Sequence, residues 1–330
     1  MPESTPKKVV RRRDGSDRYE IDQCALYKTG SLRRLAKILL IEKSDLIALS
    51  NRRDLYSVYD LEDDDEFSDK RGKVRKIQDP VEELKKIQRR VAKLLHYVRV
   101  PRYLHSAVKG VSYRSNVKAH AHAGSNILTM DVASFYSSTR ESQVFRFFRE
   151  TLLCAPDVAR MLTRLLTWHG VLPTGGPASP LLSFHCNREM FDEIAREAER
   201  AGVVFTCYVD DITFSGTNVK RGFASLIDRI VRRSGYRIAA QKTRFYRPNQ
   251  AALVTGAVIQ DGKVSVPHAR RRKARRIEIA ARSTKDPARR LALTEKLMGL
   301  AGEAAYIDPA YRGWAYAVRG RLVALRKSAA

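Results

Sequence analysis

Two adjacent carboxylates stand between two short apolar runs in TCYVDDITFSG, residues 206–216. Asp210 and Asp211 repel each other, and acidic residues are depleted in strands. A third aspartate, Asp131, ends another β-prone run, NILTMD. If the two strands are neighbours in one antiparallel sheet, all three carboxylates converge on one edge.

Three converging carboxylates are typical of metal-assisted phosphoryl transfer. Mg²⁺ prefers hard oxygen ligands and keeps positions for water and phosphate. Two such ions, about 4 Å apart, clamp the attacking and leaving oxygens of an in-line displacement. We therefore expect Asp131, Asp210 and Asp211 to be catalytic and to ligate two Mg²⁺ ions. The simpler alternative is that Asp-Asp only closes a turn, where Asp is common.

The elements around these residues predict an α+β fold. Helical periodicity dominates from Ile21 to about His96, in SLRRLAKILL and again in VEELKKIQRRVAKLLHYV. Between these helices the acidic run YDLEDDDEFSD, residues 59–69, lacks the ligand spacing of a calcium loop and is interpreted as a solvated loop.

Later segments alternate strands with helices. VVFTCY and ITFSG predict a hairpin around Val209 and Asp210, and ALVTGAVI with KVSVP predicts another that turns at Asp261-Gly262. Helices are expected in VFRFFRETLL, DVARMLTRLLTW and RGFASLIDRIVRRSG, and a Gly/Pro loop in LPTGGPASP. From about Pro267 the chain is helical and very basic, so we expect a catalytic centre followed by a helical basic domain.

The charge predicts a polyanionic partner. Lys and Arg number 62 against 36 Asp and Glu, a net charge of +26, which favours nucleic acid over a merely soluble basic surface. HARRRKARR has six basic residues among nine, more than a solvated helix needs. We expect phosphate contacts with an RNA stem from the following side chains: Arg270, Arg271, Arg272, Lys273, Arg275 and Arg276.

Other functional classes find little support. The four cysteines stand far apart without a CxxC pair, which argues against a zinc ribbon or a disulfide framework and fits a reducing cytosol. His120 and His122 lack the companions of a metal site. No run approaches the roughly 20 apolar residues of a membrane span. We therefore expect a cytoplasmic protein that does not interact with membranes.

Several segments together resemble reverse transcriptases. YVDD resembles their catalytic hairpin, MDVASFYSS their first catalytic strand, LPTGGPASPLLS their LPQG…SP segment and AAQKT their later lysine motif. VKGVSYRSNVKAH resembles the NAxxH region of bacterial retron enzymes, and ALVTGAVI their VTG signature. The pieces occur in the family's order over about residues 100–300. Thr174, Val117, Val209 and SFHCN depart from the usual pattern, although none removes a carboxylate.

The resemblance implies a right-hand polymerase with fingers, palm and thumb. We expect a basic flexible tail over residues 1–20, an N-terminal helical and fingers region over 21–124, a palm over 125–266 with finger elements at about 140–180, and a basic helical thumb over 267–330.

The resemblance also implies roles for side chains near the aspartates. Tyr136 would pack beneath the incoming sugar and exclude a 2′-hydroxyl. Thr174, which stands where the family usually has glutamine, and Gly175 would border the nucleotide and template. Lys242 would neutralise or protonate the leaving pyrophosphate. The finger-region candidates for the triphosphate are Lys109 and Arg114.

The implied partners are a structured noncoding RNA that serves as template and primer, its RNA–DNA product, deoxynucleoside triphosphates and a separate effector protein. Retron enzymes start from a 2′-hydroxyl of a guanosine and make branched, RNA-linked DNA, commonly in anti-phage defence. Recognition of the RNA would involve these motif residues: Asn116, His120, Val254, Thr255 and Gly256.

Alternatives remain open at this point. One is another bacterial reverse transcriptase, of the group II intron-like, CRISPR-associated or abortive-infection type. Another is an RNA-binding scaffold that has lost activity, although the intact aspartates argue against it. A basic DNA-binding regulator would need a recognition-helix module, and the sequence contains no recognisable one.

Overall fold

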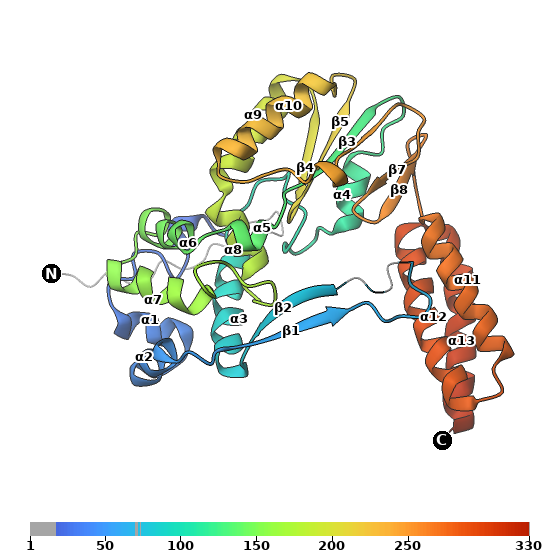
Figure 1. The fold of residues 1–330 in the computed structure, drawn as a ribbon, viewed down its shortest axis with the longest axis horizontal. Helices are drawn as coiled ribbons and strands as arrows, with labels where there is room; N and C mark the ends of the chain where they lie inside the picture. The colour runs from blue at the N-terminus through green and yellow to red at the C-terminus, as the bar shows by residue number, and fades with distance from the viewer. Residues whose placement is uncertain (1–17, 70–71, 73, 330) are drawn as a thin grey trace.

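The computed structural model describes residues 18–69, 72 and 74–329 (Figure 1). Residues 1–17 of the predicted tail over residues 1–20 therefore lie outside the described residues. Tyr19, at the end of that predicted tail, instead belongs to the fold. It forms a β-bridge with Val98, and its hydroxyl donates a hydrogen bond to the Leu94 carbonyl at 2.7 Å.

Helices from the N-terminal and middle parts of the chain form one layer of the molecule. They are α1 (Leu32–Leu39), α2 (Lys43–Asn51), α3 (Glu82–His96), α6 (Glu141–Arg146), α7 (Pro156–Leu166) and α8 (Ser179–Cys186). The helices predicted over SLRRLAKILL and VEELKKIQRRVAKLLHYV are confirmed. The Ser31 side chain caps α1 by accepting from the Arg34 amide, and Leu35, Leu84 and Val91 are fully buried.

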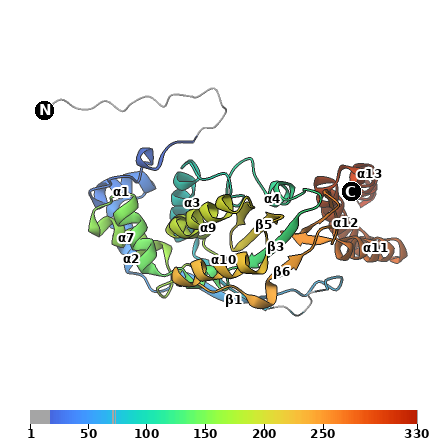
Figure 2. The ribbon, with the colours of Figure 1, turned by 90° about the horizontal axis from the view of Figure 1, so that it is seen from above.

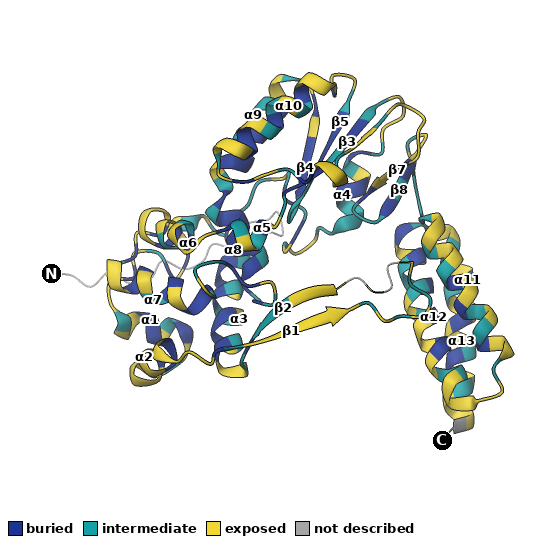
Figure 3. Cartoon of the chain, viewed as in Figure 1, coloured by how far each residue is buried: buried dark blue, intermediate teal, exposed yellow. Residues whose placement is uncertain are grey.

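An antiparallel hairpin projects from this layer. It comprises β1 (Tyr56–Glu62) and β2 (Val74–Pro80), paired from Tyr56↔Pro80 to Glu62↔Val74. β1 is exposed over most of its length and β2 over Val74–Lys76, and both strands extend toward the C-terminal helices (Figure 3). The prediction of a solvated loop over residues 59–69 is therefore wrong for Tyr59–Glu62, because these residues belong to β1 and pair with β2.

A four-stranded antiparallel sheet forms the centre. Its order is β4 (Val204–Tyr208), β5 (Asp211–Gly216), β3 (Asn126–Asp131) and β6 (Arg244–Tyr246). Successive residues of β5 point to opposite faces. Phe214 meets Phe223 of α10 (Arg221–Arg233), whereas the Ser215 hydroxyl bonds His120 at the end of α4 (Tyr113–Ala119). Both faces are covered, with α9 (Arg188–Arg200) beside α10 (Figure 1).

A smaller sheet and a helical bundle complete the chain. The sheet contains β7 (Ala252–Val254), β8 (Ala257–Gln260) and β9 (Lys263–Ser265), with the predicted turn at Asp261-Gly262. The bundle contains α11 (His268–Ser283), α12 (Pro287–Ile307) and α13 (Arg312–Ala329), and lies at the opposite end of the molecule from α1 and α2 (Figure 2). Its own core includes Ile277, Leu297 and Val318.

The α+β class predicted from the sequence is confirmed. The four cysteines are unpaired. Within the described part of the chain, no helix has the length and apolar character needed to cross a membrane.

Candidate active site

Strand register brings the three aspartates together. β3 and β5 are antiparallel neighbours, with Asp131 directly opposite Asp211. Asp210 lies in the turn before β5, and its carbonyl accepts a hydrogen bond from the Val132 amide at 2.9 Å. A short helix, α5 (Phe135–Ser138), follows β3 at this edge. The convergence predicted from the sequence is therefore observed.

The turn that carries Asp210 is conformationally unusual. Val209 has a φ of 60°, in the left-handed region where a β-branched residue is rare. Such a conformation costs roughly 1–3 kcal/mol and persists only when the surroundings fix it. Here the Val209 amide donates to the Ser106 hydroxyl at 2.9 Å. Ser106 thus helps hold the turn, a role that nothing in the hairpin's own sequence reveals.

The carboxylates stand in a mutually repulsive environment. Burial, followed by the charge of Asp131, raises the pKa of Asp210. Burial, followed by the charges of Asp210 and Asp131, raises the pKa of Asp211 to about 6. The site therefore disfavours its own negative charge and would be stabilised by added cations.

One cation already reaches the site. The Lys242 ammonium lies 2.7 Å from Oδ2 of Asp131. The other oxygen of that carboxylate, Oδ1, is buried without a hydrogen-bond partner. An orphaned buried carboxylate oxygen is costly, and a bound cation would satisfy it.

The donor set fits a hard divalent cation, although it is not a finished cage. Over the described residues, no three His, Cys, Asp or Glu side chains form a group that could hold a metal ion. Carboxylate oxygens are the ligands that Mg²⁺ prefers, and Mg²⁺ commonly completes its shell with water and substrate phosphate. Two facing strands with repelling aspartates and one unsatisfied oxygen therefore fit an ion that arrives with substrate.

Two further side chains are close enough to feel these charges. Burial and then Asp210 raise the pKa of the Tyr136 hydroxyl, which places this predicted sugar-contacting residue beside the aspartates. Arg75 on β2 counteracts the raised pKa of Asp210. Arg75 was not among the residues predicted from the sequence, because its position near the site depends on the β1–β2 hairpin.

The loop that contains Thr174 and Gly175 docks against β2. The Thr174 amide and hydroxyl both donate to Oε1 of Gln78, at 3.0 and 2.9 Å. A Cβ on Gly175 would lie 2.5 Å from the Gln78 carbonyl oxygen. The glycine is thus explained by close approach of the hairpin backbone, and its predicted contact with the template remains a prediction.

The predicted triphosphate ligands of the finger region have other neighbours. The Arg114 guanidinium lies over the ring of Tyr306, 5.0 Å from its centroid, and so contacts α12 of the bundle. Lys109 is exposed, and its carbonyl accepts from Arg18. The cations whose charges reach Asp210 are Lys242 and Arg75 instead.

His120 and Asn116 are wholly buried, which corrects their predicted contact with RNA. His120 bonds the hydroxyls of Ser215 and Thr206 at 2.8 and 2.7 Å, and burial lowers its pKa to about 3. Asn116 donates to the Thr255 hydroxyl at 3.2 Å. Both are therefore packing and hydrogen-bonding residues that fix α4 onto the sheets.

The predicted RNA-contacting segment Val254–Gly256 is the other half of that junction. Val254 is fully buried, and the Thr255 hydroxyl donates to the Tyr113 carbonyl at 3.3 Å. A Cβ on Gly256, at φ 88°, would lie 2.9 Å from the Arg270 guanidinium. Two motifs that are remote in sequence thus form one structural unit.

The six residues of α11 that were predicted to contact RNA separate into three environments. Arg270 pairs with Glu303 at 2.6 Å, inside the bundle's junction with the small sheet. Arg271 and Arg275 are exposed. The remaining three are ion-paired with the acidic run of the β1–β2 hairpin: Arg272, Lys273 and Arg276.

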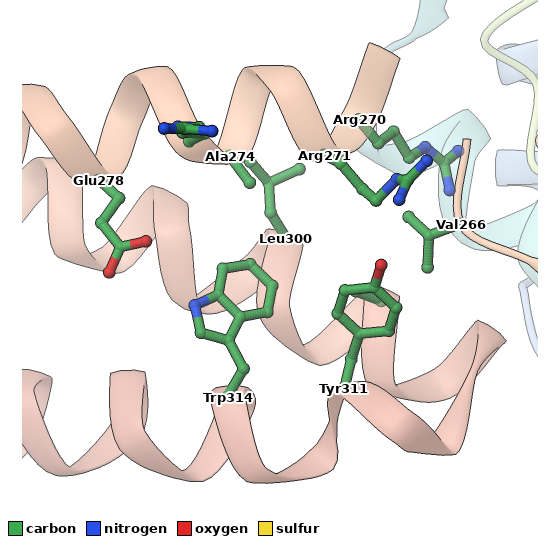
Figure 4. Close-up of a pocket in the computed structure, with 10 residues that line it drawn as sticks. Val266, Arg270, Arg271, Ala274, Glu278, Leu300, Tyr311 and Trp314 are labelled. Atoms are coloured by element: carbon green, nitrogen blue, oxygen red, sulfur yellow. The ribbon is translucent and has the colours of Figure 1, made fainter. Parts of the chain in front are cut away.

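A cavity of about 390 Å³ opens beside α11. Arg271 reaches it from α11, and Tyr311 and Trp314 face it side by side from the opposite side (Figure 4). Its apolar walls and arginine rim fit a surface that contacts nucleic acid, since guanidinium and aromatic planes both stack on bases.

A family model, reverse transcriptase (RNA-dependent DNA polymerase), matches residues 64–278. The matched range includes the three aspartates, strand β2 of the projecting hairpin and most of α11. The chain therefore belongs to the reverse transcriptase family, and the predicted right-hand polymerase fold is confirmed.

Curated relatives refine this placement. The chain is 30% identical over 151 residues to the retron Se72 reverse transcriptase of Salmonella heidelberg, which covers 44% of this chain and 38% of that protein. It is 28% identical over 274 residues to the retron Mx162 reverse transcriptase of Myxococcus xanthus, which covers 72% of this chain and 56% of that protein. The matches thus span about half of the relatives' length, and the predicted resemblance to retron-type enzymes is confirmed.

A solved structure of telomerase from Candida albicans, in complex with a fragment of telomeric RNA, also aligns. It covers 80% of this chain and 56% of that chain, with a TM-score of 0.42 and 10% sequence identity.

Proposed function

We propose that the chain is a retron-type RNA-directed DNA polymerase. The observation that carries the proposal is the β3–β5 register, which sets Asp131 opposite Asp211 with Asp210 in the adjoining turn. The family match and the retron relatives support the same conclusion.

Asp131, Asp210 and Asp211 would hold two Mg²⁺ ions. When bound, these ions supply charge neutralisation to the attacking and leaving oxygens of phosphoryl transfer. The residues that would hold them are the ones whose pKa values are raised or whose oxygen lacks a partner.

The chain's own side chains would orient the substrates. In the reaction, a primer hydroxyl would lose its proton to solvent, its oxygen would bond the α-phosphorus of a deoxynucleoside triphosphate, and the bond from that phosphorus to the pyrophosphate oxygen would break. Lys242, now paired with Asp131, would turn to the departing pyrophosphate and donate a proton to it. Arg75 would face the triphosphate from the β2 strand. Tyr136, beside Asp210, would pack under the sugar and exclude a 2′-hydroxyl.

We extend the proposal to the partners that the retron resemblance implies. The template and primer would be a structured noncoding RNA, with synthesis starting at a guanosine 2′-hydroxyl and yielding branched, RNA-linked single-stranded DNA. A separate effector protein and a role in anti-phage defence would complete the system. A cytoplasmic location accords with four unpaired cysteines.

The test is to purify the protein from its native locus and run its bound nucleic acid on a denaturing gel, before and after RNase. We expect a discrete DNA band that shifts on RNase treatment and disappears in Asp210→Asn. Asp228→Asn, a surface aspartate paired with Arg232, is the matched control and should keep the band. RNA alone, unchanged in Asp210→Asn, would contradict the proposal.

A further inference from the structure

The tip of the β1–β2 hairpin lies against the C-terminal bundle. We call residues Asp63–Asp69 the acidic segment, and it reaches α11 and α12 from the far side of the molecule (Figure 1). Asp69 accepts from Arg272 at 2.8 Å and from Arg276 at 2.9 Å. Asp65 lies 2.6 Å from the Lys273 ammonium. The bundle therefore contacts a cluster of carboxylates, and Asp69 of this cluster lies 203 positions before its partner Arg272 in the sequence.

The contact is broader than these pairs. Glu66 lies 3.5 Å from Arg289, and Asp65 also lies 3.8 Å from Lys296 on α12. Phe67 packs its ring against the bundle's core, and its carbonyl accepts from Arg276 at 2.7 Å. Apolar and polar contacts together give the acidic segment a defined seat on the bundle.

The partners of this segment are the residues expected to bind RNA. Arg272, Lys273 and Arg276 form one side of α11 whose density of charge predicts phosphate contacts. Here each of them is neutralised by a carboxylate. A carboxylate and a phosphate offer an arginine the same pair of acceptor oxygens, so both compete for one guanidinium.

We propose that the acidic segment is a built-in competitor that covers a site on α11 and α12 for the phosphate backbone of double-helical RNA. RNA would seat on this face only after it displaces the carboxylates. The inference rests on the proposed function for the identity of the polyanion, and on the ion pairs alone for the competition.

The weakness of the two pairs formed by Asp69 suits this role. The side chains of Arg272, Arg276 and Asp69 are all more than 40% exposed, and exposed ion pairs contribute little individually. A long duplex that offers many phosphates would displace the segment, whereas a short or single-stranded fragment would not. The device would therefore reduce non-specific binding by a chain with a net charge of +26.

The test compares two triple variants of the full chain. Asp65→Asn/Glu66→Gln/Asp69→Asn removes three charges that face the bundle. Asp60→Asn/Glu62→Gln/Asp64→Asn removes three from the same hairpin, and no ion pair joins these to the bundle in the described parts of the chain. The probe is a fluorescent RNA duplex of about 20 base pairs, long enough to present two successive minor grooves, with affinity measured by anisotropy.

We expect the first triple to bind roughly tenfold more tightly than the natural chain, and the control triple to gain only the roughly two- to threefold effect of net charge. An equal gain in both triples would show that only net charge matters. Weaker binding by the first triple would show that the segment clamps RNA rather than excludes it. Either result overturns the proposal.

A second measurement follows displacement directly. Amide hydrogen exchange over residues 63–69 of the natural chain should accelerate when the duplex is added, because Asp65 and its turn leave the bundle. Unchanged or slower exchange would overturn the proposal. Primer extension by the natural chain on an RNA template is measured in parallel, so its failure would refute the proposed function and leave the binding comparison intact.

Discussion

Replacement of Asp211 by asparagine should stabilise the fold while it abolishes polymerisation. Burial and two neighbouring carboxylates raise the pKa of Asp211 from 3.8 to about 6. The folded chain thus holds this proton more tightly than the unfolded chain. The stability that this group confers is fully present below about pH 4 and is lost as the pH rises to about 6.

The size of the effect follows from the shift. A change of about two pKa units corresponds to roughly 3 kcal/mol, and partial solvent screening reduces this to about 1–3 kcal/mol. Asparagine keeps the shape of the side chain without its charge. At pH 8 in EDTA, Asp211→Asn should therefore unfold in urea with a free energy about 1–3 kcal/mol above that of the natural chain. Near pH 4 the two should coincide.

Magnesium should reverse the comparison. Mg²⁺ that binds the folded state raises its stability, and the natural chain offers one more carboxylate than Asp211→Asn. Asp60→Asn, which removes an exposed charge on β1, is the control and should match the natural chain under both conditions. Equal or lower stability of Asp211→Asn at pH 8 in EDTA would refute the idea that the aspartates repel one another in the absence of metal.

Three other substitutions test the surrounding structure. His120→Ala should lower the free energy of unfolding by about 2–4 kcal/mol in urea titrations, since it leaves two buried hydroxyls unpaired, and should flatten the loss of natural stability as the pH falls below 6.5; little change would contradict its structural role. Gly175→Ala should displace β2, because the added Cβ meets a carbonyl oxygen at 2.5 Å, and should raise the KM for deoxynucleotides in primer extension; an unchanged KM would separate the hairpin from the nucleotide. Tyr136→Ala should admit ribonucleotides at least tenfold better relative to deoxynucleotides, which matches the roughly 1–3 kcal/mol of a lost steric or packing contact; an unchanged ratio would place the sugar elsewhere.

Local patterns predicted the elements, because each depends on neighbours in sequence. The apolar spacing within SLRRLAKILL and within VEELKKIQRRVAKLLHYV predicts two helices. Their predicted inward residues, which include Leu35, Leu84 and Val91, are buried. The β-prone runs VVFTCY and ITFSG on either side of Asp210 predict the β4–β5 hairpin. The pairing register of these two strands then follows from which side chains face the core. The aspartate cluster depends in addition on the pairing of β3 with β5, which was assumed from the sequence and which the observed register provides.

Side-chain roles that depend on remote partners were not predictable. Asn116, His120 and Val254–Gly256 were expected to touch RNA, because they lie in motifs that resemble those of retron enzymes. His120 is buried and bonds Ser215 and Thr206 of the central sheet, and Asn116 is buried and donates to Thr255, whereas Thr255 and Gly256 are only partly buried. A sequence pattern cannot distinguish a polar group that awaits a ligand from one that is already satisfied within the fold.

The acidic run illustrates this limit most clearly. Considered alone, Asp63–Asp69 has the composition of a solvated loop, and the basic stretch of α11 that of an RNA-binding helix. Each interpretation ignores the other segment, and the hairpin brings the two together. In our proposal, a strongly basic chain that carries a cluster of acidic residues on the tip of a projecting hairpin has a means of covering its own site for a polyanion. The distribution of opposite charges between elements, rather than the net charge, would then determine which surface is free when RNA arrives.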